Sequence, residues 1–94
     1  MKRRLEAVEL ARKLRLRRSR GIEAFLKAEL IVAVARESKA QRLTHAELAR
    51  RSKLPRSAVT GILSGSLQRV TLDRILKLVE AVGLVPEIKV KKVA

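Results

Sequence analysis

The chain has 94 residues, of which 47% are hydrophobic, and it carries a formal net charge of +14 with no cysteine. This length fits one domain with a compact core, and the lack of cysteine excludes disulfides and thiolate metal sites and is typical of a cytoplasmic protein. The excess of Lys and Arg predicts a polyanionic partner, either nucleic acid or an anionic membrane surface. Phe25 is the one aromatic residue among many Leu, Ile, Val and Ala, which favours packed helices over a β-sandwich.

Residues 1–20 form a basic arm with a net charge of +7. Apolar residues recur in it at steps of three, at Leu5, Val8, Ala11 and Leu14. This pattern predicts either a basic amphipathic helix over residues 2–18 or an arm that becomes ordered only on an acidic partner. The residues Ser-Arg-Gly at 19–21 then indicate a break, so that the arm is followed by one domain over residues 21–94.

A second helix is predicted over residues 22–40, and its middle, Leu-Ile-Val-Ala-Val-Ala at 30–35, is apolar on every side. That run is far too short to cross a bilayer. A helix without a polar face is normally buried on both sides. We therefore expect a cover beyond the domain's own core, supplied by the arm or by a second copy of the chain.

The next two helices form a helix-turn-helix unit. Thr44 and Glu47 match a capping box, which predicts a short helix over residues 45–52. Pro55 is well placed as the first residue of a helix that ends at about Ser64, before Gly65. Two short helices joined by a tight turn are typical of DNA-binding proteins, although the same corner also occurs for packing alone.

The last helix is predicted from its cap at Thr71 to Gly83, with an apolar stripe facing the core. From residue 84 to 91 apolar and polar residues alternate, which predicts a short strand whose proline places it at a sheet edge. Because an isolated strand leaves its backbone groups unpaired, we expect it to pair with its own copy across a two-fold axis. The dimerisation residues predicted from this are Leu84, Ile88 and Val90.

The predicted helix over residues 55–64 has one apolar face and one unusual polar face. Val59, Ile62 and Leu63 lie on the apolar side. The other side carries short side chains and no acid: Arg56, Ser57, Thr60, Gly61 and Ser64. A narrow face of this kind fits the DNA major groove, where Arg56 can reach guanine and the hydroxyls can reach base edges. Gly61 then allows a close approach to DNA, unless it relieves a crowded contact or is merely tolerated.

Residues 43–90, from Leu-Thr-His-Ala-Glu-Leu-Ala-Arg-Arg-Ser to Pro-Glu-Ile-Lys-Val, resemble the lambda-repressor-like XRE family, in particular its HigA-type antitoxin and small-regulator branch. The resemblance extends over most of the chain, from about residue 24 to residue 90. It implies an all-α bundle of four or five helices with a short C-terminal strand. It also implies that the helix over residues 55–64 is the recognition helix.

The resemblance places several DNA-contacting residues. His45 occupies the position of a glutamine that commonly touches the phosphate backbone, although a solvated cap residue is the alternative. Base-reading positions are occupied by Arg56, Ser57 and Thr60, and Ser64 lies in a loop near phosphate. This chain departs from the family where a larger polar residue is common, at Gly61, and where glycine is common, at Lys53.

Other basic residues are candidate phosphate contacts, and Arg69 is the first of them because it lies in the connection leading to a helix start. The others are Arg50, Arg51, Lys53 and Arg74.

These observations predict a sequence-specific transcriptional regulator, a dimeric repressor that binds an inverted repeat. The alternative is an antitoxin that binds a small toxin protein and represses its own operon. A third class, a membrane-surface peptide fused to a helical domain, is disfavoured because the arm lacks Trp and Phe. No nucleophile, base or metal constellation can be assembled around the single histidine, so neither an enzyme nor a cofactor is expected.

Overall fold

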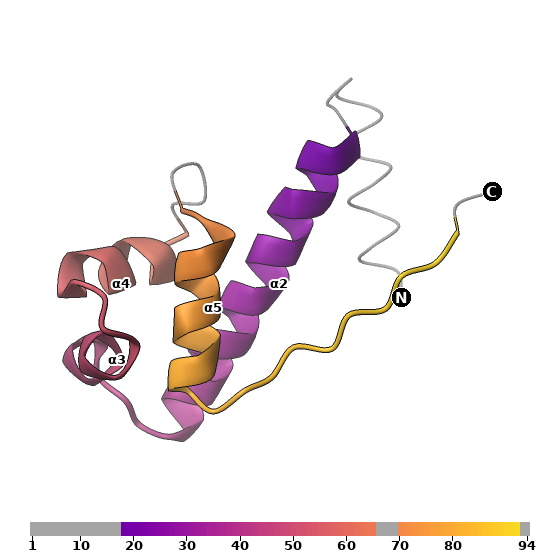
Figure 1. The fold of residues 1–94 in the computed structure, drawn as a ribbon. Coiled ribbons are helices and arrows are strands. Elements are labelled where there is room, and N and C mark those ends of the chain that lie inside the picture. Colours follow the sequence, from indigo (N-terminus) through magenta and orange to yellow (C-terminus); the bar gives the residue numbers. More distant parts are fainter. Residues whose placement is uncertain (1–17, 66–69, 93–94) are drawn as a thin grey trace.

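The computed structural model describes residues 18–65 and 70–92, which hold four helices. They are α2 (Arg18–Ala40), α3 (His45–Ser52), α4 (Arg56–Leu63) and α5 (Leu72–Ala81). The short helices α3 and α4 lie together beside α5, and the long helix α2 runs along the bundle (Figure 1). The expected all-α bundle is confirmed for this part of the chain, whereas the predicted arm helix over residues 2–18 lies almost entirely outside it.

The start of α2 differs from the prediction. The expected break at residues 19–21 is absent, and the helix begins at Arg18 and continues through Gly21. Serine and glycine each weaken a helix by about 1 kcal/mol or less relative to alanine. That cost does not end a long helix whose later turns are held by packing.

The turn between α2 and α3 is built by backbone hydrogen bonds and a cap. The N–H of Leu43 donates to Ser38 O at 2.9 Å, which closes the end of α2. The predicted capping box is confirmed: the N–H of Glu47 donates to Thr44 Oγ1 at 3.1 Å, and the N–H of Thr44 donates to Glu47 Oε1 at 3.2 Å. This cap fixes where α3 begins.

The turn between α3 and α4 requires an unusual backbone at its first residue. Lys53 has φ 60° and ψ 26°, the left-handed conformation that favours glycine. Leu54 follows and is buried, so the turn is pinned to the core. Pro55 is the N-cap of α4 and not its first helical residue as predicted, so the helix begins one residue later, at Arg56.

Replacing Lys53 with glycine is expected to raise the free energy of unfolding by about 1 kcal/mol, because glycine adopts the left-handed conformation without a Cβ clash. Thermal or urea unfolding measures this. Lys53→Ala is the matched control, since it removes the same charge but keeps the Cβ. A gain of stability in the alanine variant as well would show that the lysine charge, not the backbone, is the cause.

The core is formed by side chains from all four helices together with Leu54 and Val82. The most deeply buried are Val34, Leu48, Val59, Ile62, Ile75 and Leu78. The predicted cap at Thr71 is confirmed, since its Oγ1 accepts from the N–H of Arg74 at 3.3 Å. At the other end Gly83 has φ 82°, which lets the N–H of Leu84 return to Val79 O at 3.0 Å and close α5.

The apolar run at residues 30–35 is covered on one side only within the described part of the chain. Ile31 and Val34 are buried in the core, whereas Val32 is 40% exposed. The second cover expected from the sequence is therefore not provided by α3, α4 or α5.

The predicted C-terminal strand is not formed. Residues 84–92 have no regular secondary structure, and the segment leads away from the helices as an extended chain (Figure 1). Leu84 packs against the core, but Ile88 is 83% exposed and Val90 89% exposed. The physical reason is that a strand needs a second strand for its hydrogen bonds, and the described residues of one chain offer none.

Candidate nucleic-acid interface

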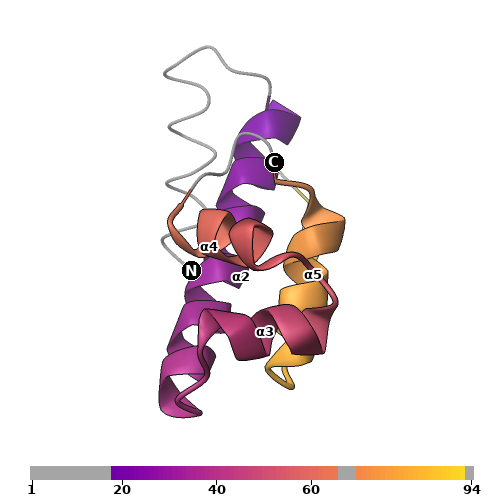
Figure 2. The same cartoon turned by 90° about the vertical axis from the view of Figure 1, so that its left-hand side faces the viewer.

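The helices α3 and α4 are held to the rest of the bundle by their apolar faces. Leu48 of α3 and Val59 of α4 are 0% exposed, and Ile62 is 2% exposed. Figure 2 shows the two helices side by side on the same side of the molecule, in front of α2 and α5. Their outward faces therefore form one continuous candidate surface.

The outward face of α4 agrees with the pattern expected from the sequence. Arg56, Ser57 and Thr60 are exposed, as is Ser64 at the end of the helix. Gly61 lies among them and is half-buried. This surface has short side chains, no acidic group and one arginine.

The N-terminus of α4 is open to an anion. Its N-cap is Pro55, which makes no side-chain cap hydrogen bond, and no acidic residue lies in the first turn. The first N–H groups of a helix have no partner inside it, and they carry partial positive charge. Arg56, the first helical residue, adds a full positive charge there, which costs stability in the free protein. Its position is explained better by an anionic partner than by folding.

Two of the predicted residues contact each other across the two helices. His45, at the start of α3, places Nδ1 2.9 Å from Oγ1 of Thr60 on α4. The contact joins the candidate phosphate-contacting residue to a candidate base-reading residue. It also fixes how the start of α3 sits against the middle of α4.

The remaining predicted residues are not brought into this cluster. Ser64 donates its hydroxyl to Gly61 O at 2.9 Å, so it closes the end of α4 rather than pointing freely outward. Lys53 is exposed in the turn between α3 and α4, three residues before Arg56. Arg69 lies outside the described residues.

The electrostatic character of the two-helix unit is basic. Residues 44–65 carry Arg50, Arg51, Lys53 and Arg56 against a single acid, Glu47. The backbone N–H and the hydroxyl of Thr44 both hydrogen bond to Glu47, and they hold the pKa of its carboxyl below the ordinary value. The carboxylate of Glu47 is therefore used to cap the start of α3.

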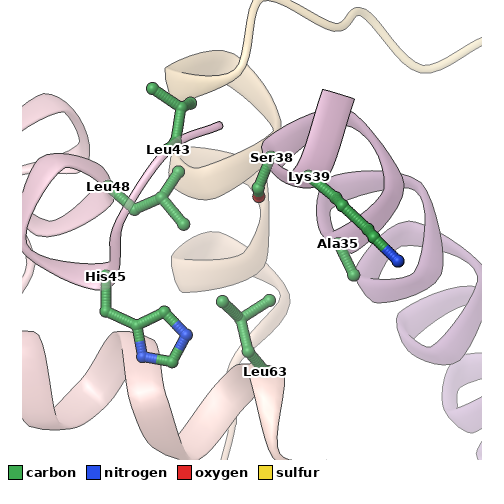
Figure 3. A pocket seen from close by; sticks show the side chains of 7 residues that line it. All are labelled: Ala35, Ser38, Lys39, Leu43, His45, Leu48 and Leu63. Carbon is green, nitrogen blue, oxygen red and sulfur yellow. The ribbon is translucent and has the colours of Figure 1, made fainter. Parts of the chain in front are cut away.

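A shallow hollow of about 340 Å³ lies beside this cluster. Figure 3 shows its lining, which comes from α2, α3, α4 and the turn between α2 and α3: Ala35, Ser38, Lys39, Leu43, His45, Leu48 and Leu63. The walls are mainly apolar. Among the residues that the structure describes, no group of three or more His, Asp or Glu could hold a metal ion, and no helix is long and apolar enough to cross a membrane.

Comparison with protein families gives a match to a model described as a helix-turn-helix domain, over residues 18–91. The chain belongs to this helix-turn-helix family. No match was found among curated proteins or among solved structures. The matched range holds all four described helices and most of the extended C-terminal segment.

In a helix-turn-helix protein the second helix of the unit lies in the major groove, and the first crosses the DNA backbone. In this chain the first helix of the unit is α3 and the second is α4, in the order predicted from the sequence. Gly61 lies on the outward side of α4, and a Cβ built on it meets no atom within 4 Å among the described residues. Among the described residues, Gly61 therefore relieves no crowded contact, which was one of the alternatives left by the sequence.

Replacing Gly61 with alanine is expected to stabilise the helix-turn-helix domain by about 1 kcal/mol, because alanine is the better helix former. Thermal unfolding measures this effect. The same change is expected to lower DNA affinity, because a methyl group on the outward side of α4 would hold the helix backbone away from a groove that it enters. Unchanged or improved affinity would mean that Gly61 is merely tolerated.

Arg51, one of the candidate phosphate contacts, is exposed and also reaches toward the end of α5. Its Nη1 lies 3.5 Å from Gln41 Oε1 and 3.5 Å from Ala81 O, at the end of α5. Gln41, which the sequence analysis did not single out, donates through Nε2 to Val82 O at 2.8 Å. These contacts tie the helix-turn-helix unit to the C-terminal end of α5. In the sequence, the one signal for a contact between Arg51 and the end of α5 is its positive charge, because cations are favoured at helix C-termini.

Proposed function

We propose that the protein is a sequence-specific DNA-binding transcriptional regulator, a dimeric repressor that inserts α4 into the major groove. The observation that carries the proposal is the outward face of α4: exposed Arg56, Ser57 and Thr60, no acid, and a glycine that leaves the backbone accessible. Membership of the helix-turn-helix family supports DNA as the partner.

In this proposal the side chains divide into two groups. Arg56 donates in bidentate fashion to guanine O6 and N7, and Ser57 and Thr60 contact neighbouring base edges or a thymine methyl group. His45, Lys53, Ser64 and Arg69 contact phosphates, together with Arg50. The basic arm at residues 1–20 adds sequence-independent attraction to phosphate, which strengthens binding at low salt.

The extended C-terminal segment supports the dimer. Leu84 anchors the segment to the core, while the β-branched residues Val85, Ile88 and Val90 are 83–89% exposed. Pairing of this segment with its counterpart in a second copy would satisfy its backbone groups and cover Ile88 and Val90. A two-fold dimer also presents two α4 helices to the two half-sites of an inverted repeat.

The same segment favours the second candidate function, an antitoxin of the HigA type. An exposed extended segment with apolar residues can add to the sheet edge of another protein as well as to its own copy. A small toxin protein would then bind residues 84–90 while α4 binds the operator. The two functions differ in the partner of the C-terminal segment and share the DNA interface.

The proposal is tested by selecting preferred duplexes from a random pool and comparing the affinity of the best one with that of a scrambled duplex. A specific regulator is expected to prefer its selected duplex by at least about a thousandfold at physiological salt. A protein that binds polyanions only through its net charge would bind both duplexes equally. That result would overturn the proposal.

A further inference from the structure

His45 and Thr60 form a hydrogen-bonded pair whose chemistry depends on the charge of the imidazole. The Nδ1 and Oγ1 atoms are 2.9 Å apart, His45 is half-buried, and Thr60 is exposed on the outward face of α4. A neutral imidazole has one donor and one acceptor nitrogen, whereas a protonated imidazole has two donors. A threonine hydroxyl has a single proton to donate and can also accept. A protonated ring therefore donates from Nδ1 to Thr60 Oγ1. In the neutral ring the tautomer decides: with the proton on Nε2, where it can donate to the phosphate proposed for His45, Nδ1 accepts from the Thr60 hydroxyl.

The direction of that bond determines what Thr60 can offer to DNA. If Nδ1 accepts, the hydroxyl proton points at His45 and the hydroxyl oxygen remains an acceptor, which suits adenine N6 or cytosine N4. If Nδ1 carries a proton, it donates to Oγ1, and the hydroxyl proton is released toward an acceptor such as guanine O6 or thymine O4. The two states read opposite hydrogen-bonding groups on a base edge.

We propose that His45 is a specificity-determining residue. With Nε2 donating to a phosphate, the neutral ring accepts from Thr60 and leaves its hydroxyl an acceptor toward DNA, whereas the protonated ring donates to Thr60 and leaves its hydroxyl a donor. The inference rests on the proposed function, because it assumes that Thr60 faces a base. It predicts that the preferred base at one position of each half-site changes with pH. His45 acts through Thr60 and is in this respect a positioning residue.

The charged groups around the pair do not compete with it as titrating groups. Lys39 of α2 lines the same hollow as His45 (Figure 3), and Arg56 lies one turn before Thr60 on α4. Lysine and arginine side chains in general change charge far above the pH range in which histidine does. On α3, Glu47 has a lowered pKa and is held in the cap of Thr44, so it remains ionised there. The chain contains one histidine, and a pH effect on base preference can therefore be assigned to it.

The experiment selects duplexes with the full chain at about pH 5.5 and about pH 8, which bracket the ordinary titration of histidine. Pairs of duplexes that differ at a single base pair are then compared in binding assays. The wild type is expected to change its preference at one base pair by about three- to tenfold, the size of one neutral hydrogen bond. His45→Gln, which cannot be protonated, is expected to show the same preference at both pH values. Thr60→Val is expected to lose this preference at both.

The outcomes separate the inference from the function on which it rests. A wild type that selects the same base at both pH values overturns the role of His45 while leaving specific binding intact. A preference that still changes with pH in His45→Gln also overturns it, because the titrating group must then lie elsewhere. A wild type that selects no sequence at either pH value overturns the proposed function itself. Circular dichroism of both variants checks that their helices are retained.

Discussion

Replacing Arg56 with alanine is expected to weaken binding to the selected duplex by about 1–3 kcal/mol, which corresponds to about five- to 150-fold in affinity. Discrimination at one base pair should be lost with it, because a bidentate arginine contact distinguishes guanine from the other bases. The fold should not suffer, since Arg56 is exposed and its charge opposes the dipole of α4. Titration of labelled selected and scrambled duplexes measures both effects.

The control for Arg56 is Arg74→Ala, which removes the same charge from the exposed surface of α5. This variant should weaken binding to selected and scrambled duplexes by the same factor, because a charge at a distance acts on phosphates alone. A second comparison uses a selected duplex with 7-deazaguanine at the contacted position, which lacks N7. The wild type should lose affinity for it and Arg56→Ala should not. Equal losses of affinity in both proteins would mean that Arg56 contacts phosphate and not the guanine base.

Replacing Ile88 with proline is expected to convert the dimer to a monomer and to abolish tight operator binding. Proline removes a backbone donor and an apolar side chain from the segment at once. Loss of the second α4 removes the avidity of a bivalent contact, which amounts to about a hundredfold or more. The helices should remain intact, because Ile88 is 83% exposed and lies outside the core. Sedimentation velocity, circular dichroism and duplex titration give the three readouts.

The matched control is Ile88→Thr, which keeps the N–H donor and the β-branched shape but lowers the apolar contact. It should weaken the dimer less than proline does. A wild-type protein that sediments as a monomer at micromolar concentration, and yet binds a full palindrome without cooperativity, would contradict the dimer. The exposed segment would then be assigned to a partner protein, as in the antitoxin alternative.

The helix-turn-helix unit could be predicted because its signals are local. The capping box of Thr44 and Glu47 fixes the start of α3, and Pro55 and Gly65 bracket α4 within a residue or two of its observed ends. The apolar spacing on α4 also predicted which of its residues are buried. Caps and helical periodicity depend on neighbours within about one turn, so a single sequence is sufficient to find them.

The remaining features depend on residues far apart in the chain or on a second molecule. The contact between His45 and Thr60 spans 15 residues and depends on how α3 packs on α4. The contact of Arg51 with Ala81 O depends on where α5 ends. The alternation of apolar and polar residues after Gly83 predicted a strand. A strand forms only when a second strand takes up its backbone hydrogen bonds, and the alternation does not show where that second strand lies.

In the proposed complex, two copies of α4 enter the major groove of one inverted repeat. This claim is tested most directly by methylation protection, in which the wild-type protein is bound to its selected duplex and guanine N7 reactivity is measured along both strands. We expect two symmetric groups of protected guanines whose centres lie about one helical turn, or a multiple of it, apart. In Arg56→Ala the protection should disappear at one guanine in each half-site. Uniform weak protection along the duplex, unchanged by loss of Arg56, would contradict the claim.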